Sequence, residues 1–433
     1  MRRRDFIKTL AAAGLCAAQP WVNNPVQAAN LTPYRGKFFV SISADGGWDV
    51  TSFCDPKANS LINRWASNQG VQSIQDSPIQ YAPFAHNSAF FQAHHKNMLV
   101  INGIDCQTNA HEAGVRHVWS GQLAHGYPSF SAIAAATLGA NLPLAYISNG
   151  GYKETAGITQ YTLMQDPTSL KKLVFPNQFL DYDSEGDWDP AKQYHRTNAM
   201  DLIQQAKMDR LTRLRGRNQL TPKQVNSLND LFNARVGVDQ LAPLAQTMPD
   251  TLVSNTDSDG EWNPLMRQAQ IALASYEAGL CVAADLTMWG FDTHSDHDAE
   301  HTTALQRLQN GIDYLWQEAV RRGIDDKLVV LVSSDFGRTP EYNDGDGKDH
   351  WPITSTIIMS KGQSWTDQVV GATSNEHNAL KINPTTLALD EAGILIQPKH
   401  IQQAMRRLAG IEEHEISQMF PLAAENIAFF NDV

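Results

Sequence analysis

Short hydrophobic runs alternate with amphipathic and polar stretches along most of the chain. The runs are rich in β-branched and aromatic residues and are bounded by glycine, proline, aspartate or serine, which is typical of buried strands. We therefore predict strands at 37–44, 97–104, 143–148, 280–288, 327–333 and 353–360.

Helical periodicity appears between these runs. Apolar residues between Leu305 and Ala319 recur on one face of a helix, as expected for a helix packed on a parallel sheet. Further helices are predicted at 111–120, 129–136, 384–393 and 400–408. This alternation predicts an α/β fold with a mostly parallel central sheet flanked by helices.

The pattern changes between about residues 181 and 259, where Gln, Asn, Arg and Asp dominate and strand signals are few. We interpret this stretch as a polar helical insertion. The chain has 433 residues, and α/β folds of this length often form one domain with insertions. We therefore predict a single domain at 30–433.

The first residues predict export. Arg3 and Arg4 begin a sequence that resembles a twin-arginine signal, and a short apolar run and a small-residue site at 26–28 follow. The segment 1–29 would then be removed, the twin-arginine translocase would be a partner during export, and the protein would be periplasmic or secreted. The apolar run is too short to span a bilayer, so no stable membrane anchor is expected. A lipoprotein signal at Cys16 is disfavoured because Leu15 precedes it.

Charge and cysteine content argue against a nucleic-acid-binding protein and against a disulfide-rich scaffold. The formal net charge is -12, and no basic run with interleaved aromatic residues follows the signal, so nucleic acid is not expected as a partner. Cys54, Cys106 and Cys281 remain in the mature chain without CxxC spacing, so at most one disulfide could form.

Acids and histidines follow the predicted strand ends. Because the carboxyl ends of parallel strands meet at one edge of a sheet, these side chains should converge in one crevice, and a divalent cation commonly holds such a group together. The candidates after three of the strands are Asp45, Asp49, Asp292, His294 and Asp335, and one more candidate, His350, follows later.

These motifs, in this order, resemble the exported bacterial family known as domain of unknown function 1501. The resemblance rests on the Gly46-Gly47 turn, His111 with Ser120-Gly121, the Asp292-Thr293-His294 segment and Asp335 to Thr339 followed by Asp349-His350. That family is similar to the alkaline phosphatase and sulfatase superfamily, which implies an alkaline-phosphatase-like sandwich with a metal crevice at the strand ends.

The resemblance implies one metal bound by Asp292, His294 and His350, with His297 as a competitor for His294. It implies a second metal at Asp45 and Asp335, but Phe336 stands where the superfamily has a histidine ligand. A phenyl ring donates no lone pair, so this departure argues against a complete second site. The metal could be Zn, Ca, Mg or Mn.

The place of the superfamily nucleophile falls on His111, which can act as a nucleophile, an acid, a base or a ligand. Thr51, Ser52 and Thr108 are hydroxyls that could replace it. Arg338 would grip an anionic oxygen through its planar guanidinium, and Asp49 competes with Asp45 for a catalytic role.

Each of these candidates has a structural alternative. Asp45 could cap a turn, Asp292 and His294 could cap a helix, and Asp335 with Arg338 could form a structural ion pair. The acidic loop at 343–349 resembles a calcium loop, but Lys348 occupies a ligand position, so we interpret the loop as a solvated turn.

The expected function is hydrolysis of a phosphate or sulfate ester, with a small anionic ester or a sulfated or phosphorylated glycan as substrate. Phe336 and the missing hydroxyl nucleophile favour an alternative, a non-catalytic exported binding or assembly protein with at most one metal. A carbohydrate-active or surface-layer protein is a third possibility, suggested by export and by ten tryptophans.

Overall fold

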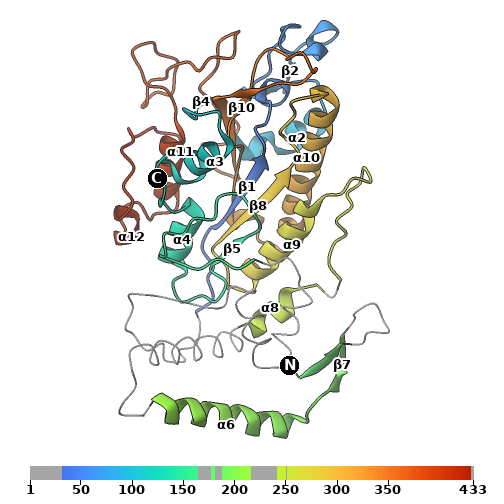
Figure 1. Ribbon diagram of the computed structural model, residues 1–433, viewed down its shortest axis with the longest axis vertical. Helices are drawn as coiled ribbons and strands as arrows, with labels where there is room; N and C mark the ends of the chain where they lie inside the picture. The colour runs from blue at the N-terminus through green and yellow to red at the C-terminus, as the bar shows by residue number, and fades with distance from the viewer. Residues whose placement is uncertain (1–31, 164–176, 181–187, 216–240, 250, 431–433) are drawn as a thin grey trace.

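A seven-stranded sheet in the order β13-β4-β12-β9-β1-β8-β5 forms the centre of the molecule (Figure 1). The computed structural model describes residues 32–163, 177–180, 188–215, 241–249 and 251–430, so the predicted signal at 1–29 lies outside the described residues. The strands of the sheet are β1 (Phe38–Asp45), β4 (Met98–Asp105), β5 (Tyr146–Ser148), β8 (Ala283–Trp289), β9 (Leu328–Ser333), β12 (Ile353–Ser360) and β13 (Gln368–Val370).

Six of these strands run in one direction, and β12 runs antiparallel to both of its neighbours. The predicted α/β class with a mostly parallel sheet is therefore confirmed. The reversed direction of β12 is a feature that its hydrophobic pattern could not reveal.

Helices cover both faces of the sheet (Figure 1). One layer contains α2 (Asn87–His94), α9 (Pro264–Glu277) and α10 (His297–Arg321), and the other contains α3 (His111–Ser120), α4 (Phe130–Leu138) and α11 (Pro398–Leu408). Side chains alternate along β1: Phe38 and Val40 join the core beneath α9 and α10, whereas Phe39 joins the core beneath α4 and α11. The result is a three-layer sandwich.

Shorter helices and strands lie in the connections between these main elements and after α11. They are η1 (Val50–Ser52), η2 (Arg64–Ser67), β2 (Gln72–Ser73), β3 (Gln80–Tyr81), η3 (His95–Asn97), η4 (Asp325–Lys327), β10 (Gly337–Arg338), β11 (His350–Trp351) and α12 (Glu415–Gln418). None of the helices in the described ranges is both long enough and apolar enough to cross a membrane. Cys54, Cys106 and Cys281 are buried and unpaired.

The predicted insertion is described in part. It contains α6 (Thr197–Arg215) and α8 (Ala242–Thr247), and α6 lies beyond one end of the sandwich (Figure 1). Near its start, β7 (Trp188–Gln193) pairs with β6 (Gln178–Leu180) in an antiparallel hairpin that the polar sequence did not predict. The division into one domain with this insertion stays a prediction.

The helix predicted at 384–393 is wrong, because this segment forms turns. The side chain of Asn383 accepts hydrogen bonds from the backbone N–H groups of Thr385 and Thr386 at 3.0 and 3.1 Å. Ile382 forms isolated bridges with Leu389 and Ile394, so the backbone pairs across the loop instead of along a helix. Local side-chain bonds of this kind compete with helix formation.

A buried carboxyl group lies between β8 and α4. Asp285 accepts hydrogen bonds from Ser131 Oγ at 2.5 Å and from the hydroxyl of Tyr146. Burial raises the pKa of Asp285 to about 7, although both hydroxyl groups oppose this shift.

Asp285→Asn should remove a pH dependence of stability. Between about pH 4 and 7 the unfolded chain ionises at this position while the folded chain stays protonated, so the free energy of unfolding falls as pH rises. The slope is on the order of 1.4 kcal/mol per pH unit. Urea unfolding from pH 4.5 to 7.5 should show this slope in the wild type and a flatter profile in the variant. Identical profiles would contradict a protonated Asp285.

Candidate active site

The adjacent strands β9, β1 and β8 end side by side, and their following residues line one edge of the sheet. Asp45 ends β1, Asp335 follows β9 and Asp292 follows β8. His111 begins α3, and His350 begins β11, where it lies opposite Arg338 of β10. The sheet topology thus brings together residues that are far apart in the sequence.

The closest cluster consists of Asp292, His294 and His350, which we call the ligand cluster. Asp292 Oδ1 lies 3.1 Å from His294 Nε2 and 3.1 Å from His350 Nε2. The two Nε2 atoms are 2.9 Å apart. These are the residues that the sequence assigned to a first metal, and the structure places His294 beside Asp292 where His297 was the competitor.

In each of these two histidines, the hydrogen bond at Nδ1 determines whether Nε2 has a lone pair free to bind a cation. His350 Nδ1 lies 2.8 Å from the backbone carbonyl oxygen of Asn109, and His294 Nδ1 lies 2.9 Å from Asp349 Oδ1. Both partners only accept hydrogen bonds, so each Nδ1 carries the proton. In the neutral rings both Nε2 atoms therefore present lone pairs, together with a carboxylate oxygen, to one point. Such a donor set fits a divalent cation.

Charge and hydrogen bonding also favour the ionised form of Asp292. Partial burial alone would raise its pKa, but the hydrogen bond from Arg338, the contact with the His350 imidazole and the charge of Arg338 lower the pKa of Asp292 to about 2. The side chain is about half exposed, with 49% of its surface accessible. A carboxylate that stays ionised and reaches solvent can bind a cation.

His111 and Asp335 form a second pair next to the ligand cluster. His111 Nδ1 lies 2.5 Å from Asp335 Oδ2, and Asp335 is buried. Because the carboxylate can only accept, Nδ1 carries the proton and Nε2 faces Asp292 Oδ2 at 3.5 Å. The hydrogen bond to Asp335 raises the pKa of His111, although partial burial opposes the shift. His111, Asp292 and His350 offer ligand atoms that all lie within 4.8 Å of one another.

Arg338 is fully buried next to Asp292. Its guanidinium donates to the carbonyl oxygens of Gly46, Gly47 and Lys348 and to Asp292 Oδ1, the last at 2.6 Å. These bonds hold together three loops that carry site residues. The geometry thus differs from the expected grip on a substrate anion, because most of the donors are already used within the protein.

Phe336 packs against two of the site histidines. Its ring is fully buried, and its centroid lies 4.8 Å from the ring of His111 and 4.5 Å from the ring of His350. The glycine turn comes close to it, since a Cβ on Gly47 would lie 2.6 Å from the Phe336 ring. Gly47 also has a φ of +87°, which other residues rarely adopt. The turn therefore requires glycine.

Asp45 lies near this pair but outside the ligand cluster. Burial raises its pKa to about 6, and the negative charge of Asp335 adds to the shift, while the hydrogen bond from Ser43 opposes it. Its carboxylate shares no hydrogen bond or ion pair with the histidines within the described residues. The second metal expected at Asp45 and Asp335 thus stays a prediction.

Asp49 occupies a different environment. Its fully buried carboxylate accepts hydrogen bonds from Lys348 Nζ at 2.6 Å and from Thr51 Oγ1 at 2.6 Å, and His297 Nε2 lies 3.1 Å away. Burial opposes ionisation, but the charge of Lys348 holds the pKa of Asp49 well below its usual value. The structure does not bring Asp49 into the exposed crevice.

The interpretation of residues 343–349 as a solvated turn is wrong at Lys348. Most of the loop is exposed, but Lys348 is fully buried against Asp49. This ion pair anchors the loop directly before Asp349 and His350. Sequence reasoning also missed Asp349 as the partner of His294 and the carbonyl of Asn109 as the partner of His350. The Asp349-His350 pair was a usable signal, whereas a backbone carbonyl leaves none.

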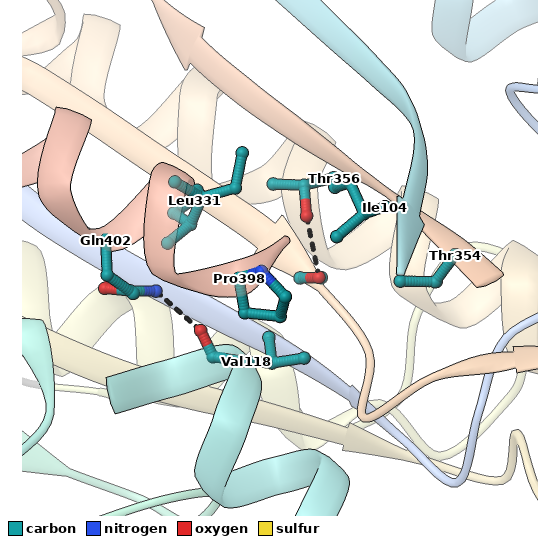
Figure 2. A pocket seen from close by; sticks show the side chains of 9 residues that line it. Ile104, Val118, Leu331, Thr354, Thr356, Pro398 and Gln402 are labelled. Atoms are coloured by element: carbon teal, nitrogen blue, oxygen red, sulfur yellow. Dashed lines mark hydrogen bonds between the residues drawn. The ribbon is translucent and has the colours of Figure 1, made fainter. Parts of the chain in front are cut away.

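A small internal cavity lies elsewhere, between the sheet, α3 and α11 (Figure 2). Its volume is about 10 Å³, enough for one water molecule and too small for a substrate. Gln402 Nε2 donates to the carbonyl of Val118 at 2.6 Å, and the Thr356 and Ser333 hydroxyls lie 2.9 Å apart (Figure 2). None of the residues of the ligand cluster lines this cavity.

Fold and site together define an α/β sandwich with a cluster of acids and histidines at the carboxyl ends of its strands. The chain belongs to the family described as "Protein of unknown function (DUF1501)", which matches residues 39–389. The predicted family is therefore confirmed. A comparison with curated proteins finds no match.

Solved structures offer distant similarities. A structure from work on glycosaminoglycan metabolism by Bacteroides thetaiotaomicron is 9% identical, with a TM-score of 0.41, and the match covers 92% of this chain and 77% of that one. The lipoteichoic acid synthase LtaP from Listeria monocytogenes is 10% identical, with a TM-score of 0.39 and coverage of 92% and 76%. Alkaline phosphatase from the Antarctic bacterium TAB5 is 11% identical, with a TM-score of 0.33 and coverage of 77% and 94%.

Proposed function

We propose that this protein is an exported, metal-dependent hydrolase of phosphate or sulfate esters. The observation that carries the proposal is the ligand cluster, in which two lone-pair nitrogens and one ionised carboxylate oxygen lie within 3.1 Å of one another. Without a cation, these electron-rich atoms would repel each other unless a ring were protonated. Asp292, His294 and His350 are the residues that would hold the metal.

The donor set also indicates which metal would bind. Two imidazoles with one carboxylate suit Zn²⁺ or another transition metal such as Mn²⁺, whereas Ca²⁺ and Mg²⁺ prefer oxygen ligands. A divalent cation bound there would polarise an ester oxygen and stabilise charge that develops on it.

His111 is proposed as the proton acceptor. Asp335 holds Nδ1–H, which fixes the ring and leaves Nε2 free to take a proton from an attacking water or hydroxyl group. Arg338 is proposed as a positioning residue that orients Asp292 and the glycine turn, and Asp49 as a structural residue. The expected substrate is a small anionic ester or a sulfated or phosphorylated glycan.

The chain's first residues support export by the twin-arginine pathway to the periplasm or the medium, and this location remains part of the proposal. Phe336 keeps the alternative open, because it favours a non-catalytic binding or assembly protein with one metal. Turnover of a simple ester discriminates between the two functions.

His111→Gln should lower the turnover of 4-nitrophenyl phosphate or 4-nitrophenyl sulfate by about 10²- to 10⁴-fold, the usual contribution of a general acid or base. Metal content and thermal midpoint should stay close to the wild type, because Asp292, His294 and His350 remain. Loss of metal in the variant would instead identify His111 as a ligand. Absence of wild-type turnover with Zn²⁺, Mn²⁺, Mg²⁺ and Ca²⁺ would favour the binding protein.

A further inference from the structure

Two exposed tryptophans form a stacked pair on the protein surface. Trp262 and Trp289 expose 54% and 44% of their surfaces, and their ring centroids are 6.1 Å apart with an angle of 16° between planes. Tryptophan usually buries most of its large apolar surface. A pair that keeps this much ring area in water is therefore a candidate contact surface.

One tryptophan of the pair lies at the edge of the sheet that carries the candidate active site. Trp289 is the last residue of β8, its partner in the sheet register is Asp45, and Asp292 follows it by three residues. Partners in a parallel register point to the same face of the sheet. The indole of Trp289 thus extends from the same edge as the candidate active site.

The turn that carries Trp262 is rigidly braced. Thr256 and Trp262 form an isolated antiparallel bridge, and Asp257 Oδ1 accepts hydrogen bonds from the backbone of Asp259 and Glu261, both at 3.1 Å. Asn263 Nδ2 donates to Asp257 Oδ2 at 3.0 Å and to the Arg307 carbonyl oxygen at 2.7 Å. The backbone that carries the exposed ring is thus fixed before any ligand arrives, which lowers the entropic cost of binding.

The guanidinium of Arg307 lies close to the tryptophan pair and is a second, independent indication of a ligand site. Its backbone carbonyl oxygen accepts a hydrogen bond from Asn263, the residue after Trp262. Its Nη2 lies close to Gly290, the residue after Trp289: a Cβ on Gly290 would be 3.1 Å from Nη2. Its Nε is buried, and within the described ranges its guanidinium has no hydrogen-bond or ion-pair partner. A half-buried guanidinium without an acceptor is suited to an anion supplied by a ligand.

We propose that Trp262, Trp289 and Arg307 form a subsite for a sugar ring that carries an anionic group. The apolar C–H face of a pyranose would stack on the exposed indole surface, and a sulfate or phosphate substituent would bind the guanidinium. The subsite rests on the proposed function, because it names the substrate class of the same crevice as an anionic glycan ester.

The surrounding charges favour a sugar over a nucleotide. Asp259 and Glu261 lie on the same turn, and Asp259 Oδ2 already contacts His86 Nε2 and Asn310 Nδ2, both at 2.8 Å. The Glu261 carboxylate can accept hydrogen bonds from sugar hydroxyls, and both acids would repel a polyphosphate chain. The single charge of Arg307 matches one anionic substituent. A base would stack equally well, but its phosphates would meet the acidic turn.

The test measures equilibrium binding to the full mature protein by calorimetry. The probes are monosulfated tetrasaccharides of galactose, glucosamine and galactosamine, the desulfated form of each, and sodium sulfate. The variants are Trp262→Ala, Trp289→Ala and Arg307→Gln, and Leu389→Ala is the matched control because it removes another exposed apolar side chain, one that has 56% of its surface accessible.

At least one sulfated probe should bind, and each tryptophan variant should raise its Kd about 5- to 100-fold, the range seen when a stacking aromatic is removed. Arg307→Gln should weaken the sulfated probe and leave the desulfated probe unchanged. Thermal midpoint and metal content should stay at the wild-type level, and Leu389→Ala should bind normally.

No binding of any probe at millimolar concentration, or equal Kd values in wild type and tryptophan variants, would overturn the subsite. Hydrolysis of nitrophenyl esters is scored separately. Turnover without glycan binding would refute the subsite alone, whereas tryptophan-dependent glycan binding without turnover would refute the hydrolase and retain the subsite. Where turnover occurs, the tryptophan variants should raise KM for the glycan ester but not for the nitrophenyl ester.

Discussion

Asp292→Ala is expected to lose bound metal and to reduce ester hydrolysis to the background. Asp292 Oδ1 is the oxygen that both Nε2 atoms of the ligand cluster approach at 3.1 Å. Removing a residue that merely supports a ligand commonly costs 10- to 100-fold in metal affinity, so loss of the ligand should cost about 100-fold or more. Hydrolysis should fall by about 10³-fold or more if the metal stabilises charge in the transition state.

The fold should survive this substitution. Arg338 still donates to the carbonyls of Gly46, Gly47 and Lys348, so its buried charge keeps three of its acceptors. Elemental analysis, a thermal melt and an ester assay check the three expectations. Asp344→Asn is the matched control, since it neutralises an exposed acid on the loop before His350. Full metal content and activity in Asp292→Ala would contradict the assignment.

Asp49→Ala is expected to be the most destabilising change at the site. It leaves Lys348 fully buried without its carboxylate partner. Removing one partner of a buried ion pair typically costs about 3–5 kcal/mol, because the remaining charge is uncompensated. The free energy of unfolding in urea should fall by about this amount.

A double variant distinguishes a structural from a catalytic role for Asp49. Asp49→Leu combined with Lys348→Met replaces the pair by apolar side chains, so stability should recover most of the loss. The folded double variant should retain its metal, because the residues of the ligand cluster are unchanged. If Asp49→Ala instead folds with wild-type stability but has no activity, Asp49 acts in catalysis, as its place after β1 first indicated.

Periodicity was enough to predict most of the sandwich. The helix expected at 111–120 and the strand expected at 353–360 match α3 and β12 in both bounds. A hydrophobic run carries no information about strand direction, so the reversal of β12 emerges only from its neighbours. The missing helix at 384–393 has a similar cause, because pairing of Leu389 and Ile394 with Ile382 overrides local propensity.

The candidate site was predictable where chemistry follows a strand end. Asp292, His294 and His350 lie together because the loop after β8 bridges the loop before β11 at Ser295 and Asp346, and their order along the chain identified them. Lys348 was missed because its loop has the composition of a solvated turn, and its partner Asp49 lies 299 residues away. A buried ion pair over such a separation leaves no local pattern.

The most direct measurement is the metal content of the mature protein, purified from an export-competent host without added metal or chelator. Elemental analysis by mass spectrometry should find close to one transition metal ion per chain, Zn or Mn, and much less in Asp292→Ala prepared in parallel. No divalent metal in the wild-type protein, even after dialysis against Zn²⁺ and Mn²⁺, would contradict the metal centre on which the proposed hydrolase depends.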